Sequence, residues 1–224
     1  MIRFRNIVVL LSLLATAACE KDNYEPPTSM LTGRVVYDGQ PVSVRSGGVE
    51  LELWQHGYEL FSKIPVYINQ DGSFSARLFD GDYKLVLLRG NGPWADNTDS
   101  IDVRVNGATT VDVPVDPYFI ISGESYQASG GTVTATFSVD QVNSNRPLER
   151  VAIYLGQTTI VDQNNNAARV DLAAADVPDL SQPLTLQAAI PASLANKGYL
   201  FARIGVKAAG VAEYLYTQPQ KITF

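Results

Sequence analysis

Hydrophobic and polar residues alternate along short stretches of this chain, and turn residues separate the stretches. The segment VELELW (49–54) alternates with the two-residue period of a strand that buries one face. The segment TVTATF (132–137) does the same. No segment beyond the first twenty-five residues shows the longer period of a helix of more than two turns. The pattern therefore predicts an all-β protein.

The first half of the chain contains a series of predicted strands bounded by glycine turns. Asp-Gly and Asn-Gly pairs supply the positive φ that tight turns require. The final two strands flank Asn106-Gly107, and we expect them to pair with each other. The predicted strands are 31–37, 49–54, 65–68, 73–79, 82–88, 100–105 and 109–115.

The second half shows about seven further strand-like segments, a number that fits an immunoglobulin-like or fibronectin-like sandwich. A short helical turn is expected after Pro191. Pro114 and Pro117 bracket a junction. We therefore predict two tandem β-sandwich domains, at 30–117 and 118–224. The strands expected in the second are 118–122, 132–139, 150–156, 168–172, 184–190, 199–207 and 211–217.

The N-terminus has the layout of a secretory signal. Arg3 and Arg5 precede the apolar run 7–18, which is too short for a spanning helix and ends in small residues before Cys19. This resembles the lipobox of bacterial lipoproteins, although Thr16 stands where leucine is commonest. We predict a signal peptide at 1–18 and acylation of Cys19. The alternative is a secreted protein with an unmodified cysteine.

Residues 19–29 are polar and contain two prolines, which predicts a lipidated tether. Several acyl chains, each contributing about 0.8 kcal/mol per buried methylene, would anchor it stably. The charged residues Glu20, Lys21 and Asp22 resemble the export signal of Bacteroidetes surface lipoproteins. The expected location is therefore the outer membrane, lipid-anchored and facing the cell exterior.

Composition excludes several kinds of function. The net charge of -6 disfavours nucleic acid as a partner. A single cysteine and a single histidine, His56, leave no intramolecular disulfide and no Cys- or His-rich metal site. Asp80 and Asp82 flank a glycine turn, where capping is a better interpretation than a glycosidase pair. No nucleophile elbow, phosphate loop or HExxH motif is present. We expect no enzyme activity, cofactor or metal.

Tryptophans are the better candidates for ligand binding. Trp94 lies in a loop with Asp96, Asn97 and Asp99, and Trp54 shares a strand face with two glutamates. Either indole could stack on a sugar ring while neighbouring side chains bond its hydroxyls. The alternative is that one or both pack between the domains. Calcium is conceivable at the three loop residues, but they lack ordered ligand spacing. Tyr58 and Tyr126 are weaker candidates.

Two longer motifs resemble known families. GRVVYDGQP (33–41) and DGSFSARLFDGDYKLVL (71–87) resemble the carboxypeptidase regulatory-like, or transthyretin-like, domain, a β-sandwich that is usually a non-catalytic accessory. The whole chain resembles a family of two-domain Bacteroidetes lipoproteins of unknown function. The segments that carry this second resemblance are 57–58, 91–94, 115–119, 202–207 and 214–216.

That second resemblance implies a place beside glycan uptake loci of the starch-utilisation type. The expected function is a surface-exposed, non-catalytic accessory of a glycan-acquisition system. It would bind glycan or a partner outer-membrane protein such as a transporter component. The alternative is a structural or adhesive protein of the cell surface.

Overall fold

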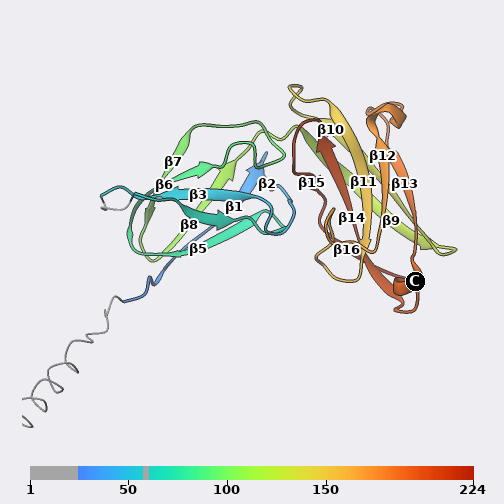
Figure 1. Cartoon of the computed structure of the whole chain (residues 1–224), viewed down its shortest axis with the longest axis horizontal. Helices are drawn as coiled ribbons and strands as arrows, with labels where there is room; N and C mark the ends of the chain where they lie inside the picture. Colours follow the sequence, from blue (N-terminus) through green and yellow to red (C-terminus); the bar gives the residue numbers. More distant parts are fainter. Residues whose placement is uncertain (1–24, 58–60) are drawn as a thin grey trace, which may run out of the picture.

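The computed structural model of the protein describes residues 25–57 and 61–224. The predicted signal peptide, Cys19, most of the tether and Tyr58 lie outside the described residues. The all-β prediction is confirmed, since two β-sandwich domains follow one another along the chain (Figure 1). Within the described residues, none of the helices has the length and apolar character needed to cross a membrane.

The first sheet of the N-terminal domain is built around one strand. That strand has two antiparallel neighbours and one parallel neighbour, which is the last strand of the domain. Leu31 and Val35 point into the core, which explains the burial alternation along it. The strands are β1 (Ser29–Tyr37), β2 (Gln40–Pro41), β5 (Ser73–Leu78) and β8 (Ala108–Pro114).

The second sheet has the order β4-β3-β6-β7 and is entirely antiparallel. Leu51, Leu53 and Leu85 are buried on its inner face. Because side chains alternate across a strand, the residues between them face outward. The strands are β3 (Glu50–Trp54), β4 (Ile64–Tyr67), β6 (Gly81–Leu87) and β7 (Ser100–Val105).

The expected pairing of the last two strands of this domain is wrong. β7 pairs with β6, whereas β8 pairs with β1 in the other sheet. The turn at Asn106-Gly107 has the predicted positive φ, 62° at Gly107, but it carries the chain from one sheet to the other. Val103 and Val105 on β7 and Val113 on β8 are therefore buried from opposite sheets of the sandwich.

The C-terminal domain is a second sandwich. One sheet has the order β13-β10-β9, and the other has the order β12-β11-β14, with two short strands on β14. The strands are β9 (Phe119–Ser129), β10 (Thr132–Gln141), β11 (Leu148–Gly156), β12 (Ala168–Ala173), β13 (Leu184–Ala189), β14 (Tyr199–Ala208), β15 (Leu215–Tyr216) and β16 (Gln220–Thr223).

Three details of this domain bear on the predictions. The helical turn expected after Pro191 is confirmed as α2 (Ala192–Ala195), and a 3-10 turn, η1 (Ala174–Asp176), follows β12. β9 runs further than predicted, with a register shift opposite β10 between Thr136 and Ser138. A bulge of this kind interrupts the alternation from which a strand is recognised.

The buried apolar residues of the two domains form one continuous cluster. Leu51 and Phe74 lie in the first sandwich, and Phe137 and Ile153 lie in the second. Phe119, which is 2% exposed, belongs to the same cluster where the chain passes between the domains. The two cores therefore meet at the junction.

Asp80 ties the start of β1 to the corner between β7 and β8. Its Oδ1 accepts hydrogen bonds from the Ser29 hydroxyl at 2.5 Å and from the Gly107 N–H at 3.0 Å. These bonds, that from Ser29 first, lower the pKa of Asp80 below its ordinary value of 3.8. Asp80 therefore has specific hydrogen-bond partners for the turn-capping role that the sequence indicated.

Replacing Asp80 with asparagine is expected to lower the urea midpoint at pH 7. The folded state lowers the pKa of Asp80, so ionised Asp80 stabilises the fold above pH 3.8, and this contribution is lost as the pH falls through the folded-state value. The difference between wild type and Asp80→Asn should therefore shrink from pH 7 to pH 3. Asp82→Asn is the matched control. An equal difference at both pH values would contradict the assignment.

Candidate ligand-binding groove and domain interface

A groove of about 590 Å³ lies on the outer face of the sheet β4-β3-β6-β7. Strand register brings its side chains together, because Trp54 lies opposite Lys84 and Lys84 lies opposite Asp102. Asp82 and Arg104 form the next row. The groove is lined by Trp54, His56, Asp82, Tyr83, Lys84, Asp102, Val103 and Arg104.

Three rings form an aromatic shelf at this groove: Trp54, His56 and Phe61. The ring of Phe61 lies 5.0 Å from that of Trp54 and 4.6 Å from that of His56, with tilts of 40° and 30°. Phe61 is 50% exposed. Large exposed apolar groups gathered in one place commonly mark a binding surface. The shelf therefore supplies apolar planes beside a polar groove.

Hydrogen bonds orient the indole of Trp54. Its Nε1 donates to Glu52 Oε2 at 3.1 Å. Lys63 donates in turn to Glu52 at 2.7 Å and to Glu50 at 3.0 Å. The bonds to Glu52 and Glu50 raise the pKa of Lys63. The edge of the indole is thus held while its ring borders the groove.

The charged side chains of the groove offer both donors and acceptors. Lys84 Nζ contacts Asp102 Oδ1 at 2.5 Å. Neither Asp82 nor Arg104 forms an ion pair with any other described residue. A few polar groups that converge on an apolar wall are the usual composition of a small-molecule site.

Trp94 lies at the domain junction and not in the groove. It is 4% exposed and forms an isolated β-bridge with Pro117. Ala95 N donates to Asp116 O at 2.9 Å on the same segment. A Cβ on Gly92 would lie 2.1 Å from the indole, so only glycine allows this packing. Trp94 is therefore buried against the segment that joins the two domains.

Asp96, Asn97 and Asp99 are exposed, and the side chains of the first two cap local turns. Asp96 accepts from Gly90 N at 2.7 Å, and Asn97 accepts from Asp99 N at 2.8 Å. Asn97 also lines a smaller groove of about 290 Å³ that Glu52 borders from β3. In the described part of the chain, no three His, Cys, Asp or Glu side chains are placed to hold a metal ion.

Of the predicted ligand-binding residues, Trp54 is the one that lines the groove of about 590 Å³. The sequence interpretation missed Phe61, Lys84, Asp102 and Arg104. The signal available was the alternation of polar residues in 82–86 and 100–104, at the positions that face outward. Placing these positions beside Trp54 requires the pairing order of three strands, which alternation does not give.

A second, smaller apolar cluster covers the outer face of the β12-β11-β14 sheet in the C-terminal domain. Tyr154, Tyr214 and Tyr216 pack over Ala152 and against Val161. A Cβ on the glycine at position 205 would lie 2.9 Å from the ring of Tyr216, so this glycine provides the space. The sheet is therefore apolar on both faces at this point. Its outer face can pack against the other domain.

Arg203 lies at the centre of that contact. It is 0% exposed, and its guanidinium lies 4.4 Å from the ring centre of Tyr216. Burial lowers the pKa of Arg203 to about 10, so the group remains charged at neutral pH. Its donors reach carbonyl oxygens in both domains: Thr217 at 2.6 Å, Val161 at 3.4 Å, Val44 at 2.9 Å and Gln70 at 3.0 Å.

Other bonds cross the same interface. Arg45 and Glu213 form a two-pronged pair at 2.6 and 3.1 Å, which raises the pKa of Arg45. Tyr216 N donates to Ser43 O at 3.0 Å in a β-bridge between the domains. Gln218 Nε2 donates to Ser43 Oγ at 2.6 Å. The interface is thus held by a buried charge, a salt bridge and backbone pairing together.

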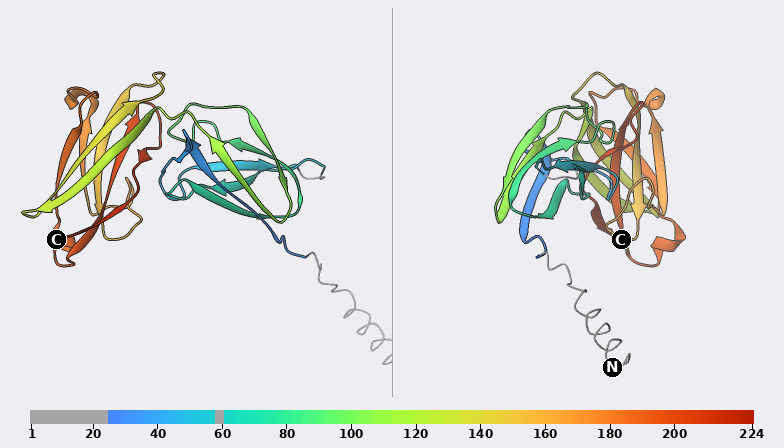
Figure 2. Two further views of the ribbon diagram at one scale, coloured as in Figure 1. Left: turned by 180° about the vertical axis from the view of Figure 1, so that it is seen from behind. Right: turned by 60° about the vertical axis from the view of Figure 1, so that its left-hand side comes forward.

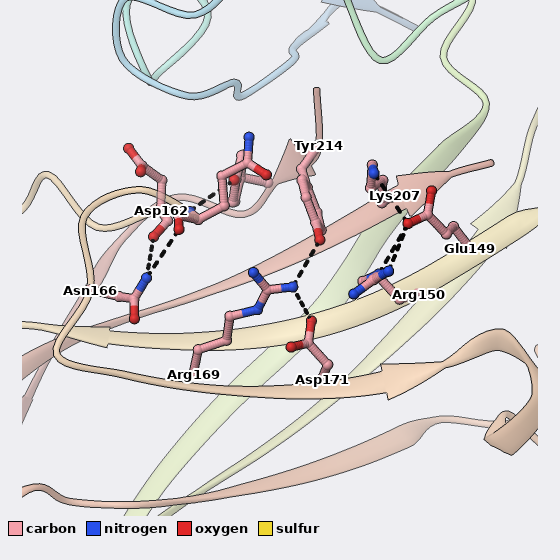
Figure 3. A network of polar contacts seen from close by, with 10 residues as sticks. Glu149, Arg150, Asp162, Asn166, Arg169, Asp171, Lys207 and Tyr214 are labelled. Carbon is pink, nitrogen blue, oxygen red and sulfur yellow. Dashed lines mark hydrogen bonds and ion pairs between the residues drawn. The ribbon is translucent and has the colours of Figure 1, made fainter. Parts of the chain in front are cut away.

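A surface network holds the tyrosine cluster from the side. Figure 3 shows Arg169 between Asp171 and Tyr214. Its Nη2 donates to Asp171 Oδ1 at 2.5 Å and to the Tyr214 hydroxyl at 3.2 Å. Glu149 accepts from Arg150 at 2.9 Å and from Lys207 on β14. The pKa of Arg169 is raised, chiefly by the bond to Asp171. The hydrogen bond from Arg169 holds the ring of Tyr214, which packs beside the interface.

The fold and the groove define a class of protein: a two-domain, all-β protein whose first sandwich presents a polar groove with an aromatic wall. The chain belongs to the DUF3823 family. The N-terminal domain of this family of unknown function matches residues 29–116, and the domain of unknown function DUF3823_C matches residues 119–221. Neither description names a catalytic activity. The predicted resemblance to a two-domain family of unknown function is confirmed.

Solved structures of the family share the whole architecture. A DUF3823 protein from Bacteroides ovatus is 43% identical, with 87% of this chain and 98% of that chain covered and a TM-score of 0.82. One from Parabacteroides merdae is 35% identical, with 89% and 100% covered and a TM-score of 0.82.

A third protein, from Bacteroides uniformis, has a name that proposes carbohydrate binding. It is 18% identical, with 88% of this chain and 100% of that chain covered and a TM-score of 0.70. At that identity the similarity shows the fold alone. No curated protein matches the chain.

Proposed function

We propose that the protein is a non-catalytic glycan-binding lipoprotein of the outer cell surface and that it binds glycan in the groove beside Trp54. The observation that carries this proposal is the aromatic shelf beside a groove in which Asp82 and Arg104 form no ion pair with another described residue. The name of the Bacteroides uniformis structure points in the same direction.

The chemistry of the groove suits a sugar. One face of a pyranose ring carries mostly C–H groups and packs against an aromatic plane such as the indole of Trp54, while its hydroxyls project at the ring edge. Asp82 can accept from neighbouring hydroxyls, and the planar guanidinium of Arg104 can donate two parallel bonds. Lys84 and Asp102 can bond to further hydroxyls while remaining paired with each other.

The same features favour binding over hydrolysis. A glycosidase needs an acid and a second carboxylate on opposite sides of the scissile bond. Here Asp82 and Asp102 come from adjacent strands of one sheet face, and Asp102 is engaged by Lys84. Neither family description supplies a catalytic residue set.

The location forms part of the proposal. The signal-like residues before Cys19 and the polar segment after it support a lipid anchor at the outer membrane. In that position the protein would serve a glycan-acquisition system as an accessory, beside a transporter component. Binding of soluble glycan is the part that the groove supports directly.

Trp54→Ala is expected to weaken glycan binding at least tenfold, which corresponds to about 1.4 kcal/mol. The loss follows from removing the indole of the shelf, which lines the groove. Isothermal titration of the purified protein against host and plant oligosaccharides measures it. Tyr67→Ala is the matched control, because Tyr67 is 56% exposed on β4 of the same sheet but does not line the groove. If the protein binds no oligosaccharide of the panel, or if Trp54→Ala binds as tightly as the wild type, the proposal is refuted.

A further inference from the structure

The groove lies at the end of the N-terminal domain where the chain enters it. Ser29, the first residue of β1, is bonded to Asp80, which directly precedes β6. Met30 N donates to Gly107 O, just beyond the end of β7. The groove is lined by the first residues of β6, the last of β7 and the last of β3. The tether and the groove therefore share one end of the domain.

The C-terminal domain lies at the opposite end. β1 runs from Ser29 to Tyr37, and the segment after it reaches Ser43, which pairs with Tyr216 of the second domain. Figures 1 and 2 show the chain entering the first domain on the side away from the second. The bonds of Arg203 and the Arg45–Glu213 pair join the two domains into one elongated body.

The length of the tether limits how this body can turn. Nine residues lie between Cys19 and Ser29, and the ten residue steps between these two positions span at most about 35 Å when fully extended. A domain of about 100 residues has a radius of gyration near 13 Å, so two in line measure roughly 65 Å. For the body to invert, with the C-terminal domain next to the bilayer, the tether would have to cover that whole length. The extended tether is only about half as long as inversion requires.

We infer that, when the protein is anchored on the cell, the groove binds soluble oligosaccharide chains and does not bind the surface of an insoluble polysaccharide. The inference rests on the proposed function and adds the physical form of the ligand. The anchored end carries the groove toward the bilayer, and the C-terminal domain points outward. A large solid meets the C-terminal domain first, whereas a free oligosaccharide diffuses past it to the groove.

The test uses cells that display the full chain with its own tether or with about 40 Gly/Ser residues inserted after Thr28. The insertion adds enough length for the body to invert and leaves the folded residues unchanged. Each pair of probes combines a labelled soluble oligosaccharide with an insoluble particle of the same sugar. The pairs are maltoheptaose with starch granules, cellohexaose with crystalline cellulose, and xylohexaose with insoluble xylan. Trp54→Ala in each tether length gives the background. Cys19→Ser tests the anchor.

With the native tether, cells should bind the oligosaccharide of one pair and retain at least tenfold fewer particles than cells with the long tether. Equal retention of particles by both tether lengths would overturn the inference. So would surface binding that survives Cys19→Ser. If the purified protein binds none of the probes, the proposed function itself fails. If it binds oligosaccharide in solution but tether length has no effect on cells, only the present inference fails.

Discussion

Arg203→Met is expected to lower the free energy of unfolding by about 3–5 kcal/mol, a magnitude typical of removing one partner of a buried charged contact. Methionine keeps the length of the side chain but donates no hydrogen bond. Four carbonyl oxygens, two of them in the N-terminal domain, would lose their donor inside the protein. Differential scanning calorimetry should show a midpoint lower by roughly 6–20 °C.

The two domains should also unfold less cooperatively in this variant. In the wild type the interface couples them, so one transition is expected, and the loss of Arg203 should separate it into two. Lys207→Met is the matched control. It removes a cation from the same face of β14, but Lys207 pairs with Glu149 at the surface, where an ion pair contributes about 1 kcal/mol or less. If Arg203→Met matches this control, Arg203 does not hold the interface.

The pattern of the sequence predicted most strands but gave no indication of the role of Arg203. Along β14, Phe201, Arg203, Gly205 and Lys207 occupy the positions that face away from the sandwich core. In an isolated sandwich, an arginine at a position that faces away from the core would be expected to be solvent-exposed. Its burial depends on a second domain and on the segment around Tyr216, both of which meet this face through contacts distant in sequence. Alternation within one strand does not report such contacts.

The groove illustrates the same limit in a milder form. Trp54 could be identified because it follows two glutamates on the polar face of its strand. Lys84 and Arg104 could not be linked to it, since they lie on strands that come together only through non-local pairing. The wrong pairing of β7 with β8 has a related cause. A glycine turn indicates where the chain reverses or bends, but not which sheet the next strand joins.

The two tryptophans have the same side chain and contrasting positions, and this contrast can be tested. Trp94→Ala is expected to cost about 3–5 kcal/mol, the usual loss for truncating a large buried aromatic side chain. Its indole is 4% exposed at the junction, beside Pro117. Chemical denaturation monitored by circular dichroism measures the loss. Trp54→Ala, which removes a half-buried ring at the groove, should cost far less.

Because the chain contains two tryptophans, fluorescence separates them without a further label. In Trp54→Phe the remaining emission comes from Trp94 and should be blue-shifted, insensitive to soluble quenchers and unaffected by glycan. In Trp94→Phe the emission comes from Trp54 and should be accessible to quencher, and a bound sugar should protect it. If glycan instead protected Trp94, the ligand would lie at the domain junction, and the groove on the β4-β3-β6-β7 sheet would lose its assignment.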